Sequence, residues 1–77
     1  MATTSISSPI TKAILWAFDT LPVGAEFYIN QLQAKASERE PAISRMYQNS
    51  VRMVINRHRR EFYHWADRRG KLVKIGE

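Results

Sequence analysis

The chain has 77 residues but no cysteine. Disulfide bonds and thiolate metal sites are therefore excluded, and a packed hydrophobic core must hold the fold together. No segment approaches the roughly 18 consecutive apolar residues of a membrane-spanning helix, and the first seven residues lack the features of a secretory signal. We expect a cytoplasmic protein without a membrane partner, with one domain over residues 8–77 after a disordered tail at residues 1–7.

Acidic residues are scarce in the second half of the chain. The formal net charge is +5, yet residues 1–38 carry two cations against three carboxylates, whereas residues 39–77 carry ten cations against four. Eight of those ten cations are arginines, whose planar guanidinium suits phosphate oxygens and guanine edges better than a lysine ammonium does. This skew indicates a nucleic acid as the leading partner, with an ordinary solvated surface as the alternative.

The sequence also lacks the parts of an enzyme. It contains no glycine-rich phosphate loop and no recognisable pair of nucleophile and base, and its seven carboxylates are scattered. His58 and His64 have no cysteine or close acid at ligand spacing, so we expect them to be packing residues. The sequence thus predicts no catalysis, no cofactor, no bound metal and no small-molecule substrate.

The first helix is expected to begin at Pro9. Ser8 is a favourable N-cap and Pro9 fits the first helical position, so the helix should run from there to about Leu21. Its inward stripe at helical spacing is Ile10, Ile14, Ala17, Phe18 and Leu21. Trp16 lies off the centre of that stripe, and we expect it to be a partly buried packing residue.

A short strand and a second helix should follow. Residues 26–29 are aromatic and bounded by turn-forming residues, which predicts a brief strand. Asn30 then caps the second helix, and Gln33 three residues later completes a capping box. Its inward residues are Leu32 and Ala36. The proline at position 41 breaks the pattern, because the residue before a proline is pushed out of the helical region.

The third helix, predicted over residues 44–60, has the most regular pattern in the chain. One arc of about 120° at 100° per residue holds Arg45, Gln48, Asn49, Arg52, Asn56, Arg59 and Arg60. The opposite side holds Tyr47, Val51, Val54, Ile55 and His58. Pro41, Ser44 and Ser50 are all suitable first or capping residues, so three starting points are open.

After the third helix, the hydrophobic period changes from about 3.6 to 2. Residues 61–65 and 71–75 are rich in aromatic and β-branched residues, and a turn separates them. This pattern predicts a β-hairpin in which Gly70 supplies a left-handed turn position. Tyr63 and Trp65 are assigned to the core beneath the helices rather than to stacking on bases.

This order of elements over residues 9–75 resembles the winged helix, an α+β fold that adds a small antiparallel sheet to a helix-turn-helix. The resemblance implies that the helix at 44–60 lies in the DNA major groove. It also implies that the hairpin at 62–75 is a wing touching backbone or minor groove, and that the strand at 27–29 pairs with it. The connection at 37–43 is longer than a typical helix-turn-helix turn.

The polar face of the third helix and the hairpin tip supply the expected DNA contacts. They are Arg45, Gln48, Asn49, Arg52, Asn56 and Arg59 on the helix, with Arg68, Arg69 and Lys71 on the wing. Arginine can bind guanine O6 and N7, whereas asparagine and glutamine can bind adenine or contact phosphates. No acid interrupts residues 45–60, unlike the usual solvated helix with its glutamate–lysine pairs. For Arg59, interaction with the negative end of the helix dipole is a structural alternative.

The function expected from this combination is sequence-specific binding of double-stranded DNA. A chain of this size is similar to small phage or prophage regulators of transcription or recombination. A homodimer would extend the few base pairs that a lone domain reads. The alternative is a winged-helix module that docks on a host or partner protein without reading DNA, because the fold itself does not decide its function.

Overall fold

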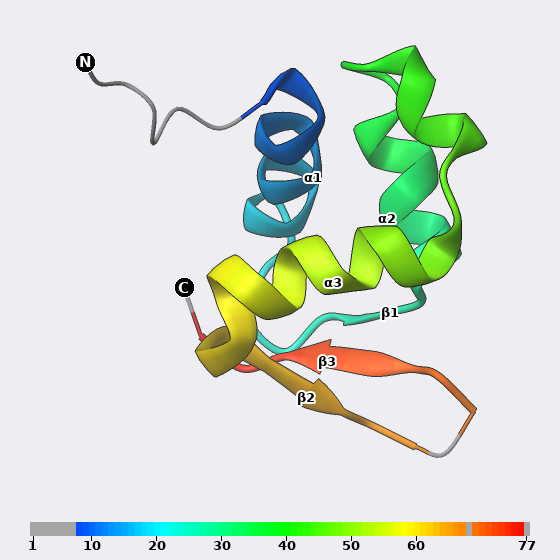
Figure 1. The fold of residues 1–77 in the computed structure, drawn as a ribbon. Coiled ribbons are helices and arrows are strands. Elements are labelled where there is room, and N and C mark those ends of the chain that lie inside the picture. The colour runs from blue at the N-terminus through cyan, green and yellow to red at the C-terminus, as the bar shows by residue number, and fades with distance from the viewer. Residues whose placement is uncertain (1–7, 68, 77) are drawn as a thin grey trace.

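The computed structural model describes residues 8–67 and 69–76, and in them three helices pack with a three-stranded antiparallel sheet (Figure 1). The helices α1 and α2 lie side by side, α3 crosses them, and the sheet lies along the other side of α3. The predicted α+β class and order of elements are confirmed, and the arrangement is consistent with a winged-helix-like fold. The tail predicted at residues 1–7 lies outside the described residues.

Helix α1, Pro9–Asp19, begins as predicted and ends two residues early. The Thr11 backbone N–H donates to the Ser8 hydroxyl oxygen at 3.1 Å, so Ser8 satisfies an amide that the helix leaves unpaired. At the other end, the Thr20 hydroxyl donates to the Ala17 carbonyl at 2.8 Å. Leu21 lies in the turn that follows rather than in the helix.

Strand β1, Glu26–Phe27, is shorter than predicted, and helix α2, Ile29–Ala36, begins two residues earlier than a cap at Asn30 predicts. The predicted capping box at Asn30 and Gln33 is wrong, because Tyr28 occupies the cap position and its N–H donates to the Gln31 side-chain oxygen at 3.0 Å. Gln33 is buried instead. Its amide donates to the Ile43 and Met46 carbonyls, both at 2.7 Å.

Helix α3, Gln48–Arg59, starts four residues later than the predicted 44–60. A 3-10 helix, Pro41–Arg45, precedes it, and a second one, Arg60–Phe62, follows it. In a helix running continuously from Ser44, the Met46 carbonyl would accept from a backbone amide one turn later. Gln33 takes that carbonyl, and Met46 has an extended backbone, so the chain bends before α3 begins.

Strand β3, Leu72–Lys74, is the central strand of the sheet. It pairs antiparallel with β1 and with β2, Tyr63–Trp65, in the order β1-β3-β2. The registers are Glu26 opposite Val73, Phe27 opposite Leu72, Tyr63 opposite Lys74, His64 opposite Val73 and Trp65 opposite Leu72. Gly70 has a φ of 96°, as predicted for the hairpin turn.

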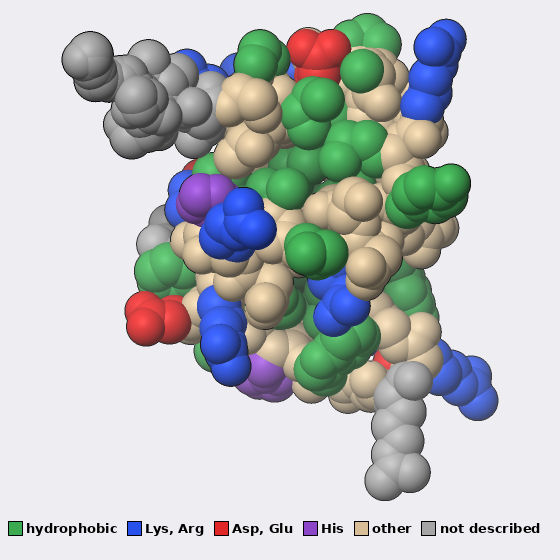
Figure 2. All heavy atoms as spheres, in the orientation of Figure 1, with side chains coloured by type: hydrophobic (Ala, Val, Ile, Leu, Met, Phe, Trp, Pro, Cys, Tyr) green, Lys and Arg blue, Asp and Glu red, His purple; other side chains and the backbone are tan. Residues whose placement is uncertain are grey.

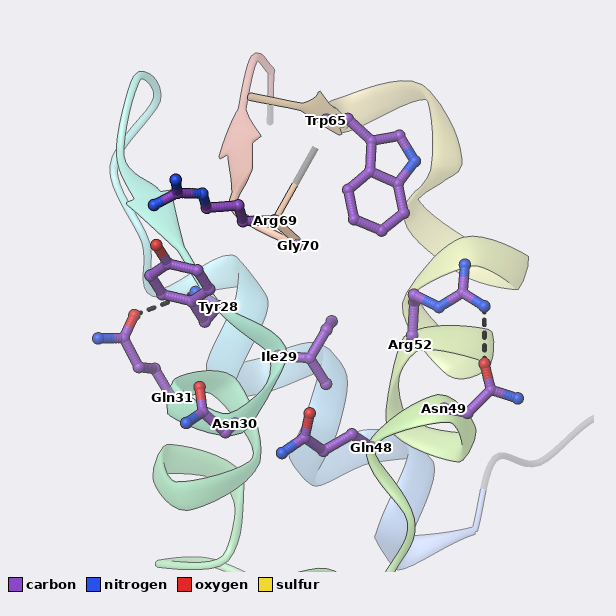
Figure 3. Close-up of a pocket in the computed structure, with 10 residues that line it drawn as sticks. All are labelled: Tyr28, Ile29, Asn30, Gln31, Gln48, Asn49, Arg52, Trp65, Arg69 and Gly70. Carbon is purple, nitrogen blue, oxygen red and sulfur yellow. Dashed lines mark hydrogen bonds between the residues drawn. The ribbon is translucent and has the colours of Figure 1, made fainter. Parts of the chain in front are cut away.

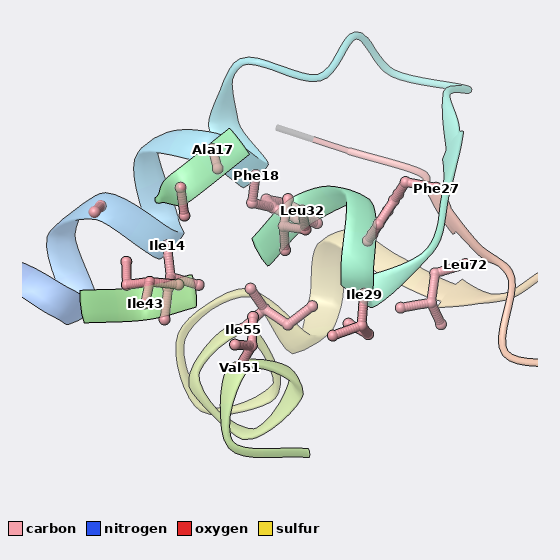
Figure 4. Packing of buried hydrophobic residues seen from close by; sticks show 12 residues of the cluster. Ile14, Ala17, Phe18, Phe27, Ile29, Leu32, Ile43, Val51, Ile55 and Leu72 are labelled. Atoms are coloured by element: carbon pink, nitrogen blue, oxygen red, sulfur yellow. The ribbon is translucent and has the colours of Figure 1, made fainter. Parts of the chain in front are cut away.

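All three helices and the sheet contribute to one core (Figure 4). Its largest fully buried hydrophobic side chains are Ile14, Phe18, Ile43, Val51, Ile55 and Leu72. Tyr63 packs edge to face on Phe18 with ring centroids 6.1 Å apart, as expected for a core residue. The expectation that Trp65 joins it is wrong, because Trp65 is 53% exposed.

Two residues of the predicted apolar face of the third helix are also exposed, Tyr47 and His58. Tyr47 precedes α3 at its cap position and so does not share the helical periodicity. One helical turn after Ile55, Arg59 is the residue whose side chain points toward α1, where it pairs with Asp19. His58, the residue before it, therefore faces solvent. The expectation that His58 packs inside is wrong for this reason.

The Lys74 side chain is buried, with 2% of the residue exposed. Its ammonium donates to the carbonyls of Phe18, Asp19 and Leu21 at 3.2, 3.4 and 2.7 Å. These carbonyls lie at the C-terminal end of α1, where helix geometry leaves acceptors unpaired and the helix dipole favours a cation. Lys74 therefore attaches the central strand to α1.

We predict that Lys74→Met lowers the free energy of unfolding by about 1–3 kcal/mol, because it removes the donor from buried acceptors while keeping the side chain's length. Urea denaturation measures the change. Lys12→Met, at an exposed position on α1, is the control and should change stability by less than about 0.5 kcal/mol. Equal stabilities of the two variants would show that the buried ammonium contributes nothing.

Candidate nucleic-acid interface

A groove of about 550 Å³ lies where α3, the start of α2 and the hairpin meet (Figure 3). It is lined by Tyr28, Ile29, Asn30 and Gln31 from the start of α2, Gln48, Asn49 and Arg52 from α3, and Trp65, Arg69 and Gly70 from the hairpin. No carboxylate is among these lining residues. The groove therefore presents guanidinium groups, amides and two aromatic rings.

Four of the predicted DNA contacts converge at this groove. They are Gln48, Asn49 and Arg52 on α3, and Arg69 on the hairpin. The Arg52 guanidinium donates to the Asn49 side-chain oxygen at 2.6 Å, and in Figure 3 this pair stands on the α3 wall, across the groove from Tyr28. Arg45 is exposed at the end of the 3-10 helix and does not line the groove.

The hairpin turn is shaped by Asp67. Its carboxylate accepts the backbone N–H groups of Arg69 at 2.7 Å and Lys71 at 3.2 Å, which leaves the Arg69 side chain at the groove. The Lys71 ammonium lies 3.5 Å from the Glu26 carboxylate and so has a partner within the chain. Arg68, the third predicted wing contact, lies outside the described residues.

Trp65 is a candidate site residue that the sequence placed in the core. It lies on the same side of β2 as Tyr63 but one pleat further along the hairpin, where the core has ended. The Arg52 guanidinium carbon lies 5.9 Å from the centre of the Trp65 ring, within cation–π range. Its position next to the polar turn was the only sequence signal for this exposure.

The start of α2 was also missed as part of the site. Tyr28, Asn30 and Gln31 line the groove opposite α3, whereas the sequence suggested only caps and helix starts there. Two adjacent amide residues directly after a strand were the available signal. They add hydrogen-bonding groups that suit a polar ligand.

Asn56 lies further along α3, at a second hollow of about 490 Å³. That hollow is lined by Met53, Asn56, Arg57, His58, Arg60, Glu61 and Phe62. The Asn56 side-chain oxygen accepts from the Tyr63 hydroxyl at 3.0 Å. Burial raises the pKa of Tyr63, while the charges of Arg52 and Arg60 lower it by less, so this phenol remains a donor at neutral pH.

Arg59 is directed away from the groove, toward α1. Its Nε and Nη2 atoms each lie 2.9 Å from one oxygen of Asp19, in a two-pronged ion pair. Hydrogen bonding by Arg59 lowers the pKa of the Asp19 carboxyl, and the charges of Arg59 and Lys74 lower it further, although partial burial opposes the change. The structure thus gives Arg59 a partner within the chain.

Cations without a carboxylate partner remain on the α3 and hairpin side. In residues 8–67 and 69–76 the ion pairs are Arg59 with Asp19 and Lys71 with Glu26, so neither involves Arg45, Arg52 or Arg69. Figure 2 shows lysine and arginine side chains spread over this face, with most carboxylates toward its edges. The positive electrostatic potential of such cations attracts polyanions.

Comparisons with known proteins identify no family for this chain. No protein-family model, curated protein or solved structure matched the chain. Within the described part of the chain, no three histidine, cysteine, aspartate or glutamate side chains are grouped to hold a metal ion. No helix in that part is long and apolar enough to cross a membrane.

The Asp19–Arg59 pair predicts a pH-dependent contribution to stability. Because the Asp19 pKa is lower in the folded state, the stabilisation is present above about pH 4 and is lost as the pH falls through the folded value. Asp19→Asn should cost about 0.5 kcal/mol at pH 7, since the pair is partly exposed. Urea denaturation at pH 7 and at about pH 2 should show this difference disappearing in acid. A difference that persists in acid would contradict the assignment.

Proposed function

We propose that this chain binds double-stranded DNA, with α3 in the major groove and the hairpin as a wing on the neighbouring backbone or minor groove. The observation that supports this best is the convergence of Arg52, Asn49 and Gln48 with Arg69 at one groove that no carboxylate lines. Such a protein acts as a sequence-specific regulator of transcription or recombination.

The dimensions of α3 suit the major groove. A helix of 12 residues is about 18 Å long and about 10 Å wide, and the major groove, about 12 Å across, admits it. Gln48, Asn49 and Arg52 lie in the first half of α3, near the end whose dipole favours phosphate. The hairpin projects beside this end, which supports a contact between the wing and the neighbouring sugar–phosphate backbone.

The side-chain chemistry separates two kinds of contact. Arg69 on the hairpin supplies a positive charge, and contacts to phosphate position a protein on DNA without reading its sequence. Amide and guanidinium groups on α3 can distinguish base edges. Two copies of the domain, bound as a homodimer or in tandem, would read a longer site than one copy can.

Fluorescence anisotropy of a labelled duplex, titrated with protein at several salt concentrations, tests the proposal. The logarithm of the association constant should fall linearly with the logarithm of salt, by about 0.9 for each phosphate contacted. Arg69→Ala should weaken binding to all duplexes similarly and reduce the slope by about one. Lys12→Ala removes an exposed cation on α1, outside the groove, and should change neither quantity.

Absent binding, or binding that does not depend on salt, would contradict this function. It would favour the alternative that the same face docks on a protein partner. An effect of Lys12→Ala as large as that of Arg69→Ala would show that the charge acts without a defined interface.

A further inference from the structure

The hydrogen bond between Arg52 and Asn49 determines which way the Asn49 amide points. Its length is 2.6 Å, from Nη2 of Arg52 to the Asn49 side-chain oxygen. A guanidinium carries donors but no acceptor, so the amide oxygen must face Arg52 and the NH₂ group must face away. Among the residues that the structure describes, that NH₂ group meets only a weak acceptor, the Met53 sulfur at 3.8 Å. Asn49 therefore presents its NH₂ donor to a ligand, while its oxygen is directed toward Arg52.

Trp65, on the same wall of the groove, contacts the same guanidinium from the hairpin. The ring centre lies 5.9 Å from the Arg52 guanidinium carbon, and Trp65 comes from the hairpin whereas Arg52 comes from α3. Two contacts from different elements thus reduce the rotamer freedom of a long side chain before any ligand binds. In Figure 3 the three side chains line one wall of the groove in the order Trp65, Arg52, Asn49.

We propose that Arg52 and Asn49 form a preorganised group of donors that reads guanine in the major groove, with Trp65 as the positioning residue. This inference rests on the proposed function. Guanine presents two acceptors there, N7 and O6, whereas adenine and cytosine each present an amino donor. The Asn49 oxygen already accepts one hydrogen bond from Arg52, so a two-bond contact with adenine would have to share that oxygen, whereas a contact with guanine uses only the free NH₂ donor.

Phosphate oxygens are also hydrogen-bond acceptors, so a guanine edge and a phosphate group would both suit the donors of Arg52 and Asn49. The two kinds of contact differ in their dependence on base sequence. A phosphate contact is indifferent to the base sequence, whereas a guanine contact disappears when the N7 acceptor is removed. Our proposal commits to the base edge, because orienting two donors in advance matters most for a ligand with two acceptors at fixed spacing.

The test begins with selection of bound sequences from random duplex DNA. Each guanine of the selected site is then replaced singly by 7-deazaguanine, which pairs normally but lacks the N7 acceptor. The parent chain should lose roughly tenfold in affinity at one or two positions. Arg52→Ala and Trp65→Leu should bind the parent and 7-deaza duplexes equally, and Trp65→Phe should recover part of the discrimination.

Two further variants keep the test decisive if Trp65→Leu fails to fold. Arg52→Lys keeps the charge but loses the planar fork, so it should lose the discrimination while keeping the salt dependence. Asn49→Ala should reduce discrimination at the same guanine or its neighbour. Thermal unfolding and binding to an unrelated duplex report whether each variant is folded.

The outcomes separate this inference from the function on which it rests. Binding to the selected site that is unaffected by 7-deazaguanine at every position would overturn the inference and indicate phosphate contacts, while leaving DNA binding intact. A folded Trp65→Leu with full discrimination would overturn the positioning role. Failure of the parent chain to bind any duplex would overturn the proposed function itself.

Discussion

The buried ammonium of Lys74 joins the sheet to the helices, because Lys74 lies on β3 and donates to carbonyls at the end of α1. Its strand, β3, is the one that pairs with both other strands, so its attachment to the C-terminal carbonyls of α1 sets the position of the whole sheet. Burying a charge is costly, and here three carbonyls and the negative end of a helix offset that cost. The β2–β3 hairpin that this attachment holds also carries Trp65, whose ring centre lies 5.9 Å from the Arg52 guanidinium carbon.

A second polar group, the Gln33 amide, positions α3 itself. By donating to two carbonyls of the connection before α3, it makes residues 41–47 a 3-10 helix and a bend rather than an early turn of α3. The long connection between the second and third helices is therefore a defined structure. Polar residues in the interior thus fix the two elements that form the candidate interface, while the apolar core determines how the helices pack.

Most of the fold could be predicted from sequence periodicity, because each element buries one regular stripe of side chains. The features that were missed depend on partners distant in the chain. The α3 start depends on Gln33, and the orientation of Arg59 depends on Asp19, forty residues away. Four predicted site residues meet at the groove, but helical periodicity cannot show which cations are already paired. Nor could strand alternation show that the core ends before Trp65.

If duplex DNA binds the face that α3 and the hairpin build together, as we propose, residues of both elements should respond to it in solution. Titration of the ¹⁵N-labelled protein with duplex DNA, followed by NMR, measures this response residue by residue. We expect the largest shifts at the backbone amides of Asn49 and Arg69 and at the Trp65 indole N–H, with little change at Lys12 on α1. Shifts concentrated on α1, or confined to α3 with the hairpin unaffected, would contradict the account.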